Sequence, residues 1–264
     1  MKTDVQVENR FHLLADEMGQ ISLEELNLRG SLQVRKDRKY LVTSDEATDL
    51  LEWIAHSGVV KDPRILNHAG THSHQYASTY FDTPDLRCYT MGLQKARRRF
   101  KTRTRTYIDS DLTFLEVKTK SRVGTVKNRI PWDQPGKLGQ GGLDFVKQMA
   151  GLSEQMMRAG LPPSLDTAYC RTTVHAAGEV GARITFDRDL HWRSPGRGIE
   201  TESAWWIIET KTSGPISAVD RKLWEWGHRP QPISKYMVGI AQFSPELPTQ
   251  RWTRAISTIT SPSH

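Results

Sequence analysis

Residues 101–120, "KTRTRTYIDSDLTFLEVKTK", place charged side chains at every second position on both sides of a turn-like segment. These residues are Lys101, Arg103 and Arg105 before the turn, and Glu116, Lys118 and Lys120 after it. Alternate residues of a β-strand share a face, so a hairpin of the two runs gathers five cations and one carboxylate on one surface. Cations about 7 Å apart repel by only ~0.6 kcal/mol in water, but by ~2.4 kcal/mol at an effective dielectric constant of about 20. Exposed to solvent, this pattern is the ordinary wet face of a sheet; enclosed, it requires an anion.

The same alternation of charge recurs in other segments of the chain. It occurs at Arg35, Asp37 and Lys39, at Lys127 and Arg129, at Arg183 and Asp187, and at Glu209 and Lys211. The intervening residues of the later segments are mostly apolar, such as Val117, Ile184 and Ile208. A sheet with one apolar face under helices and one charged face closes most economically into a barrel with a charged lumen. Because cations outnumber carboxylates there, we expect the lumen to hold a polyanion.

Two Glu-x-Lys pairs indicate how such a polyanion is bound. Glu116-x-Lys118 and Glu209-x-Lys211 each place an acid and a base side by side on one strand face. A hard divalent cation can bridge a carboxylate and phosphate oxygens while the lysine neutralises the remaining charge. The two pairs therefore predict a phosphate site that uses a divalent metal.

Composition limits the class of partner. The chain has 264 residues, 37% of them hydrophobic, and a formal net charge of +7, which favours a polyanion. A nucleic acid is not expected, because its common binding motifs are missing and the interleaved carboxylates repel a phosphodiester backbone. Cys88 and Cys170 form no metal-type cluster and indicate a reducing compartment. Without a membrane span of about 20 apolar residues or a signal peptide, the expected location is the cytoplasm.

The order of expected elements predicts a single β-rich domain with peripheral helices. This domain covers residues 31–245, between an N-terminal helical segment (1–30) and a poorly packed C-terminal tail (246–264). Helices are expected at 21–30, at 45–58 behind a Ser44 cap, over about 15 residues ending at Met157, at 216–227 and at 234–243. Two short strands are expected on either side of the "DTPD" turn at 82–85.

The quoted charges belong to a longer series of matching stretches. They are "ISLEELNLRGSLQVRKDRKYLV", "STYFDTPDLRCY", "KTRTRTY", "FLEVKTK", "KNRI", "ARITFD", "IIETK" and "ISKYMVG". In this order the series, which covers about residues 20–240, resembles the triphosphate tunnel metalloenzymes. Within them it is most similar to the polyphosphate polymerase domain of vacuolar transporter chaperone (VTC) complexes. The resemblance implies an α+β fold, an antiparallel eight-stranded β-barrel with peripheral helices, that binds triphosphate or polyphosphate with Mn²⁺ or Mg²⁺.

The resemblance also implies a role for individual residues. The catalytic candidates are Lys39, Arg103, Arg105, Lys118, Arg183 and Lys235. The substrate-binding candidates are Lys101, Lys127, Arg129, Arg171, Lys211, Ser234 and Tyr236. The metal-binding candidates are Glu209, Glu116 and Asp37.

The predicted function is transfer of the γ-phosphoryl group of a nucleoside triphosphate to a growing polyphosphate chain. Many related triphosphatases begin with Glu-x-Glu-x-Lys, whereas this chain has Arg35-x-Asp37-x-Lys39, which favours the polymerase branch and leaves the metal stoichiometry open. Two alternatives remain at this point: a triphosphatase in the same tunnel, and a polyphosphate or inositol phosphate binding module without turnover. In that family such domains often work beside a membrane-embedded partner.

Overall fold

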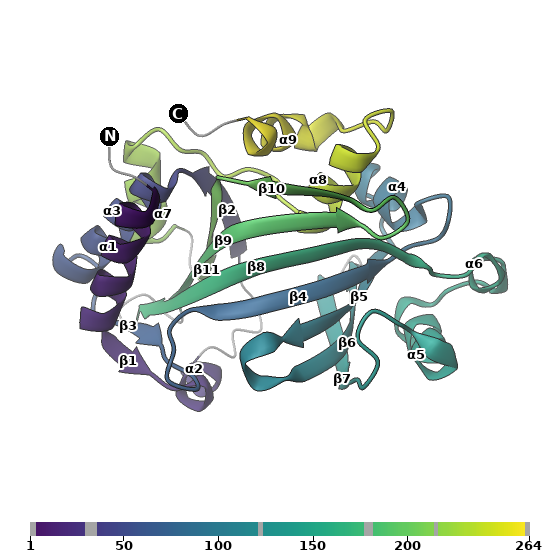
Figure 1. The fold of residues 1–264 in the computed structure, drawn as a ribbon, viewed down its shortest axis with the longest axis horizontal. Helices are drawn as coiled ribbons and strands as arrows, with labels where there is room; N and C mark the ends of the chain where they lie inside the picture. The colour runs from purple at the N-terminus through teal and green to yellow at the C-terminus, as the bar shows by residue number, and fades with distance from the viewer. Residues whose placement is uncertain (1–3, 30–35, 121–123, 177–181, 214–215, 262–264) are drawn as a thin grey trace.

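The computed structural model describes residues 4–29, 36–120, 124–176, 182–213 and 216–261, and has an α+β fold (Figure 1). Its main sheet contains eight strands in the order β2-β11-β9-β8-β4-β5-β6-β7, with β1, β3 and β10 attached beside it. The strands are β1 (Gly19–Ile21), β2 (Lys36–Val42), β3 (Pro63–Leu66), β4 (His74–Phe81), β5 (Arg99–Tyr107), β6 (Leu112–Lys120), β7 (Thr125–Pro131), β8 (Pro163–Ala176), β9 (Ala182–Ser194), β10 (Ile199–Ser203) and β11 (Trp206–Thr212).

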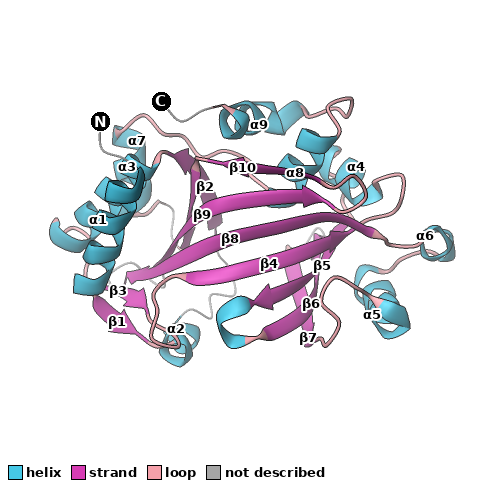
Figure 2. Cartoon of the chain, viewed as in Figure 1, coloured by secondary structure: helices cyan, strands magenta, loops and turns pink. Residues whose placement is uncertain are grey.

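Helices surround the sheet at both ends (Figure 2). They are α1 (Asp4–Glu17), α2 (Leu23–Arg29), α3 (Ser44–His56), α4 (Arg87–Leu93), α5 (Gly139–Ala150), α6 (Glu154–Ala159), α7 (Ala218–Glu225), α8 (Lys235–Phe243) and α9 (Thr253–Thr260), with 3₁₀ turns at Ile108–Ser110 and Gln250–Trp252. Among the described residues, no helix has both the length and the apolar character needed to cross a bilayer.

The hairpin expected from residues 101–120 is confirmed. Strands β5 and β6 are antiparallel, and their register pairs Lys101 with Lys118 and Arg103 with Glu116. The expected antiparallel eight-stranded sheet is also present, because every neighbouring pair along the main strand order is antiparallel. Closure is the one difference: in the described part of the chain, β2 and β7 are the two edges and do not pair with each other.

The sheet nevertheless curls until its distant strands approach one another. Strands β2 and β5 are five steps apart in the strand order, which is about 24 Å in a flat sheet. Yet Lys39 on β2 donates to the Ile233 carbonyl at 3.3 Å, and Lys101 on β5 donates to Ser234 Oγ at 2.7 Å. Because these acceptors are consecutive residues, the two strands must face each other across the α8 N-terminus. We call the concave side the inner face.

Apolar residues of the opposite, outer face pack under helices. At one end, Phe11 of α1 and Leu50 of α3 cover Phe186 and Ile208 of the central strands, all of them fully buried. At the other end, α5 covers the outer side of β6. This pattern explains why the residues between the alternating charges are apolar.

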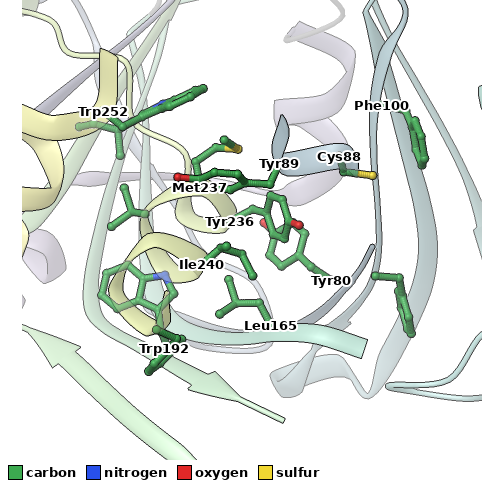
Figure 3. Packing of buried hydrophobic residues seen from close by; sticks show 14 of the residues in the cluster. Tyr80, Cys88, Tyr89, Phe100, Leu165, Trp192, Tyr236, Met237, Ile240 and Trp252 are labelled. Carbon is green, nitrogen blue, oxygen red and sulfur yellow. The ribbon is translucent and has the colours of Figure 1, made fainter. Parts of the chain in front are cut away.

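Helix α8 packs between the sheet and α4, as Figure 3 shows. Its residues Tyr236, Met237 and Ile240 are buried; Ile240 lies close to Leu165 of β8 and Trp192 of β9, whereas Met237 lies against Gly92 of α4. Trp192 Nε1 also donates to the backbone carbonyl of Lys235 at 2.9 Å, which fixes the start of the helix. The packing therefore sets where the first residues of α8 meet the inner face.

Four local expectations are wrong. Residues 87–93 form helix α4 rather than a strand, because the Asp82 carboxylate accepts hydrogen bonds from the backbone N–H groups of Cys88 and Tyr89. Thr43, not Ser44, is the N-cap of α3, and its hydroxyl forms a capping box with Glu46. The single helix ending at Met157 is two helices, α5 and α6, separated at Gly151, which has a positive φ of 64°.

The fourth correction concerns the C-terminal tail. Residues 250–260 form a 3₁₀ turn and α9, and Trp252, Ala255 and Ile259 are buried in the same cluster as α8. The tail is therefore well packed, because its apolar residues recur at helical spacing. The division into three segments stays a prediction, and Gly30 and Arg35 lie outside the described residues.

The close packing of α8 predicts a large effect of a single methyl group. A Cβ at Gly239 would lie 2.4 Å from Trp192 and 2.6 Å from Leu165, far inside van der Waals contact. We expect Gly239→Ala to lower the free energy of unfolding by about 1–3 kcal/mol in urea titrations, as overpacking does. Gly141→Ala is the control, because nothing lies within 4 Å of a Cβ there, and its higher helix propensity should raise stability by about 0.5–1 kcal/mol. Equal behaviour of the two variants would contradict this packing.

Candidate functional site

The inner face collects most of the charged residues that the sequence singled out. The register of the strands places alternate residues there, and α8 contributes one more cation. The cations are Lys39, Lys101, Arg103, Arg105, Lys118, Lys127, Arg129, Arg171, Arg183, Lys211 and Lys235, and the buried carboxylates are Glu116, Asp187 and Glu209.

Glu116 of β6 accepts from a cation on each neighbouring strand. Arg103 on β5 donates Nε and Nη2 to Oε2 at 2.9 and 2.7 Å, and Lys127 on β7 pairs with Oε1. The carboxylate is only 3% exposed. Burial alone would raise the pKa of Glu116, but Arg103, Arg105 and Lys127 together hold it well below its usual range. Glu116 is therefore a fixed anion between two strands.

Asp187 of β9, on the other side of the inner face from Glu116, is likewise held by two cations. Arg171 on β8 donates Nε to Oδ1 at 2.5 Å and Nη2 to Oδ2 at 2.8 Å, in a bidentate pair. Lys235, the first residue of α8, pairs with Oδ2 as well. Although burial opposes ionisation, the two cations hold the pKa of Asp187 well below its ordinary value. This carboxylate therefore joins β8, β9 and α8.

Glu209 of β11 is the third buried carboxylate. Lys211, two residues along the same strand, places Nζ 2.5 Å from Oε2, and Lys39 on β2 places Nζ 3.8 Å from Oε1. Lys39 is also the residue directly opposite Glu209 in the antiparallel register. Burial would raise the pKa of Glu209, but Lys39, Lys211 and Arg171 lower it well below its usual range.

The three carboxylates share one arrangement: each is held between two cations. When its lysines are protonated, each group of three therefore keeps a net charge of +1, and the six cations are only half neutralised. Two further cations are held by hydroxyl groups, Lys101 by Ser234 at 2.7 Å and Arg105 by Ser78 at 3.3 Å. The inner face can hold its shape without a ligand and still attract an anion with several negative charges.

Burial lowers the pKa of four lysines of the inner face, Lys101, Lys127, Lys211 and Lys235. Burial, followed by repulsion from Lys39 and Lys118, lowers the pKa of Lys101 to about 7. Burial also lowers the pKa of Lys127, Lys211 and Lys235 to about 8, against the attraction of their carboxylate partners. These lysines are therefore only partly charged at pH 8, and an anion placed among them would restore their charge.

Aromatic rings support the arginines of the inner face. Tyr76 and Tyr169 are stacked with ring centroids 5.2 Å apart, and the guanidinium groups of Arg105 and Arg171 lie 5.3–5.8 Å from these rings. Arg103 donates to the Tyr80 hydroxyl at 2.8 Å. Such contacts restrict the long arginine side chains without neutralising them.

Other residues predicted for the site lie outside the three ion groups around the buried carboxylates. Arg183 lies opposite Lys211 but donates to the Leu26 carbonyl of α2 at 3.2 Å. Arg129 and Asp37 are exposed, and the Arg129 guanidinium lies 4.7 Å from the centroid of the Phe114 ring.

Tyr236 is buried, and its hydroxyl pairs with Asp82 rather than with the inner cations. Because Asp82 also accepts from α4, this contact joins α4 to α8. The functional roles of all these residues stay predictions.

A preformed metal cage is not present in the part of the chain that the structure describes. No three His, Cys, Asp or Glu side chains lie together there as a metal-binding group. Each of the three buried carboxylates of the inner face is instead bound by cations. Glu209 fits a metal best, because its partners are two lysines, whose ammonium groups can turn to phosphate, and because Mg²⁺ often needs only one or two carboxylates when phosphates supply the other ligands.

Sequence reasoning did not assign a functional role to Asp187 or Asp82. A signal for Asp187 existed, because it shares the alternation of Arg183 along β9. Its two partners could not be found, since Lys235 lies 48 positions away on a helix. Asp82 ends a strand just before a helix, where a carboxylate that accepts backbone N–H groups is common.

The curled antiparallel sheet and its cationic inner face define an α+β protein built to bind an anion of high charge. Residues 34–244 match the family described as the VTC domain, which is about four fifths of the chain, and the chain therefore belongs to that family. A comparison with curated protein sequences finds no significant match.

Solved structures give weaker similarities. A provisionally assigned adenylate cyclase from Bacillus halodurans has 12% identity and a TM-score of 0.45, and the match covers 76% of this chain and 94% of that one. The Hippeastrum protein HpAC1, described with a dominant triphosphatase activity, has 14% identity and a TM-score of 0.42, with 83% and 100% covered. Pyrococcus horikoshii PH1819 has 14% identity and a TM-score of 0.42, with 78% and 99% covered. At these scores, none of the three supports a conclusion about this chain.

The buried position of Asp187 gives a stability prediction. Asp187→Asn leaves Arg171 and Lys235 without their counter-charge, and we expect the free energy of unfolding to fall by about 3 kcal/mol, within the range for breaking a buried ion pair. Denaturant unfolding measures the loss. Asp144→Asn is the matched control at an exposed position of α5, where a change of about 0.5 kcal/mol or less is expected. Equal stabilities of the two variants would mean that Asp187 does not hold the inner face together.

Proposed function

We propose that the protein is a metal-dependent polyphosphate polymerase that binds triphosphates and polyphosphate along its inner face. The observation that carries the proposal is the set of three carboxylates, each shared by two cations, on the concave side of a VTC domain. With its lysines protonated, each set carries a net charge of +1 before any ligand arrives. A chain of phosphates, which carries about one negative charge per unit, matches such a row better than a compact anion does.

The cations have different tasks in the proposed reaction. Arg103 and Arg105, at alternate positions of β5, donate to phosphate oxygens, Arg103 through the Nη N–H groups that Glu116 and Tyr80 leave unused. The lysines act as point charges; these are Lys101, Lys118 and Lys235. Their ammonium groups neutralise the negative charge that spreads over the transferred phosphoryl group. Phosphoryl transfer needs in-line positioning and neutralisation more than a covalent nucleophile, and a rigid row of arginines and lysines provides both.

A divalent metal belongs to the proposal as part of the substrate complex. Bound with the phosphates, Mn²⁺ or Mg²⁺ would neutralise charge on the transferred group, and Glu209 is the residue proposed to hold it. Glu116 and Asp37 are weaker candidates, since Glu116 is bound by an arginine fork and Asp37 is exposed.

The reaction is tested by its products. Purified protein is incubated with ATP and Mn²⁺ or Mg²⁺, and the products are resolved by ³¹P NMR. We expect signals of internal polyphosphate units from the wild type, and a loss of roughly 100-fold in their rate of formation in Glu209→Gln and Arg103→Ala. Glu154→Gln is the control, because Glu154 is exposed and pairs only with Lys147 on α5 among the described residues.

Two other outcomes would each replace the proposal. Orthophosphate alone, released from ATP or tripolyphosphate, would identify a triphosphatase. Tight binding of polyphosphate without any turnover would identify a binding module. In both cases the same inner face would be occupied, so the same variants should weaken binding.

The lowered pKa of Lys101 predicts how binding depends on pH. A bound phosphate raises this pKa from about 7 toward the ordinary value for lysine. At a pH between the pKa of the free protein and that of the complex, Lys101 therefore takes up a proton when the phosphate binds. Affinity for tripolyphosphate should therefore fall as pH rises above 7. Calorimetry in two buffers of different ionisation enthalpy measures both the affinity and the proton uptake.

Lys101→Arg provides the matched variant, because arginine stays charged over this whole range. Its proton uptake at pH 7.5–8.5 should be smaller and its affinity less dependent on pH, while Lys127, Lys211 and Lys235 keep part of the effect. Titration of the phosphate itself is common to both proteins. Identical pH profiles would show that Lys101 does not face the ligand.

A further inference from the structure

The cationic row of β5 does not end at Lys101. Arg99, two residues earlier, shares its parity and lies directly opposite Lys120, which has the same parity as Glu116 and Lys118 on β6. Arg97 and Arg98 come just before the strand and are both exposed. We call Arg97, Arg98, Arg99 and Lys120 the basic rim. Through Arg99 and Lys120, the rim continues the inner face and extends its positive charge to the open end of the β5–β6 hairpin.

The basic rim differs from the inner face in its lack of counter-charge. The segments from Leu86 to Ile108 and from Val117 to Trp132 contain no acidic residue. Among the described residues, no carboxylate forms an ion pair with any member of the rim, and Arg99 donates only to the carbonyl of Ala96, at 3.0 Å. Inside, by contrast, six cations share three carboxylates. A row of like charges without counter-charge favours an external anion.

The length of the row decides which anion fits it. Arg99 lies six residues from Arg105 along β5, a distance of about 20 Å. A triphosphate bound at Arg103 and Arg105 is too short to reach Arg99 as well. A polyphosphate of many units is long enough, and its repeated charge matches arginines and lysines spaced along a strand.

We infer that the basic rim binds the distal part of a polyphosphate chain whose end is held on the inner face. This inference rests on the proposed function and adds a direction to it: the growing chain leaves past the start of β5 and the end of β6. The rim would then make the protein bind long chains more tightly than short ones, because it contributes affinity only when the polymer is long enough to extend beyond Lys101.

The experiment compares two ligands on two double variants. Affinities for tripolyphosphate and for polyphosphate of several tens of units are measured by calorimetry for the wild type, for Arg97→Gln/Arg98→Gln and for Arg221→Gln/Arg254→Gln. The control pair lies on α7 and α9, is equally exposed and removes the same charge. We expect the rim variant to bind the long chain roughly tenfold more weakly, with a smaller dependence on salt, and to bind tripolyphosphate as the wild type does.

The remaining outcomes overturn the inference in distinguishable ways. Unchanged affinity of the rim variant for the long chain, in a protein that binds tripolyphosphate, would overturn the rim and leave the proposed function standing. Equal losses for both ligands, or in both double variants, would mean a general effect of net charge. If the rim variant lost binding only to vesicles containing phosphatidylserine, the basic rim would be a membrane-binding surface and not a polyphosphate site. A wild type that bound neither phosphate would overturn the proposed function as well.

Discussion

Repulsion between cations on one concave surface is the constraint on which the rest of the structure depends. The inner face can enclose so many arginines and lysines because each of three buried carboxylates is placed between two of them. Each of these carboxylates joins different parts of the chain: Glu116 joins β5 to β7, Asp187 joins β8 and β9 to α8, and Glu209 joins β2 to β11. The same ion groups thus hold the strands in their curled arrangement and leave the surplus charge that a ligand needs.

Helix α8 connects this charge balance to the hydrophobic core. Its buried side supplies Met237 and Ile240 to the apolar cluster, while its first turn offers Lys235 to Asp187 and Ser234 to Lys101. The packing of α8 against the core therefore determines where Lys235 and Ser234 lie on the inner face. A site whose ligands must be held closely is better supported by such a packed helix than by a loop.

Much of this could be predicted from the sequence, because alternation of charge in strands is a local pattern. The hairpin of β5 and β6, the apolar outer face and most inner cations followed from it. Helix α4 was missed because its start depends on the Asp82 carboxylate, several residues upstream. The partners of Asp187 and the burial of Trp252 depend on where α8 lies, which no local pattern encodes. The open edge between β2 and β7 depends on the total curvature of the sheet, to which every strand contributes a little.

The pairing of β2 has a consequence for how the chain folds. Among the described residues, its only partner in the main sheet is β11, whose residues come about 170 positions later, whereas β5, β6 and β7 pair with their immediate neighbours in sequence. During synthesis, the hairpins rich in arginine and lysine can therefore form early, well before Glu209 and Asp187 leave the ribosome. Glu116 emerges with these hairpins and can pair with Arg103 and Lys127 at once, whereas Lys39 stays without its carboxylate until Glu209 has been synthesised, so the β2 side of the inner face is completed late in folding.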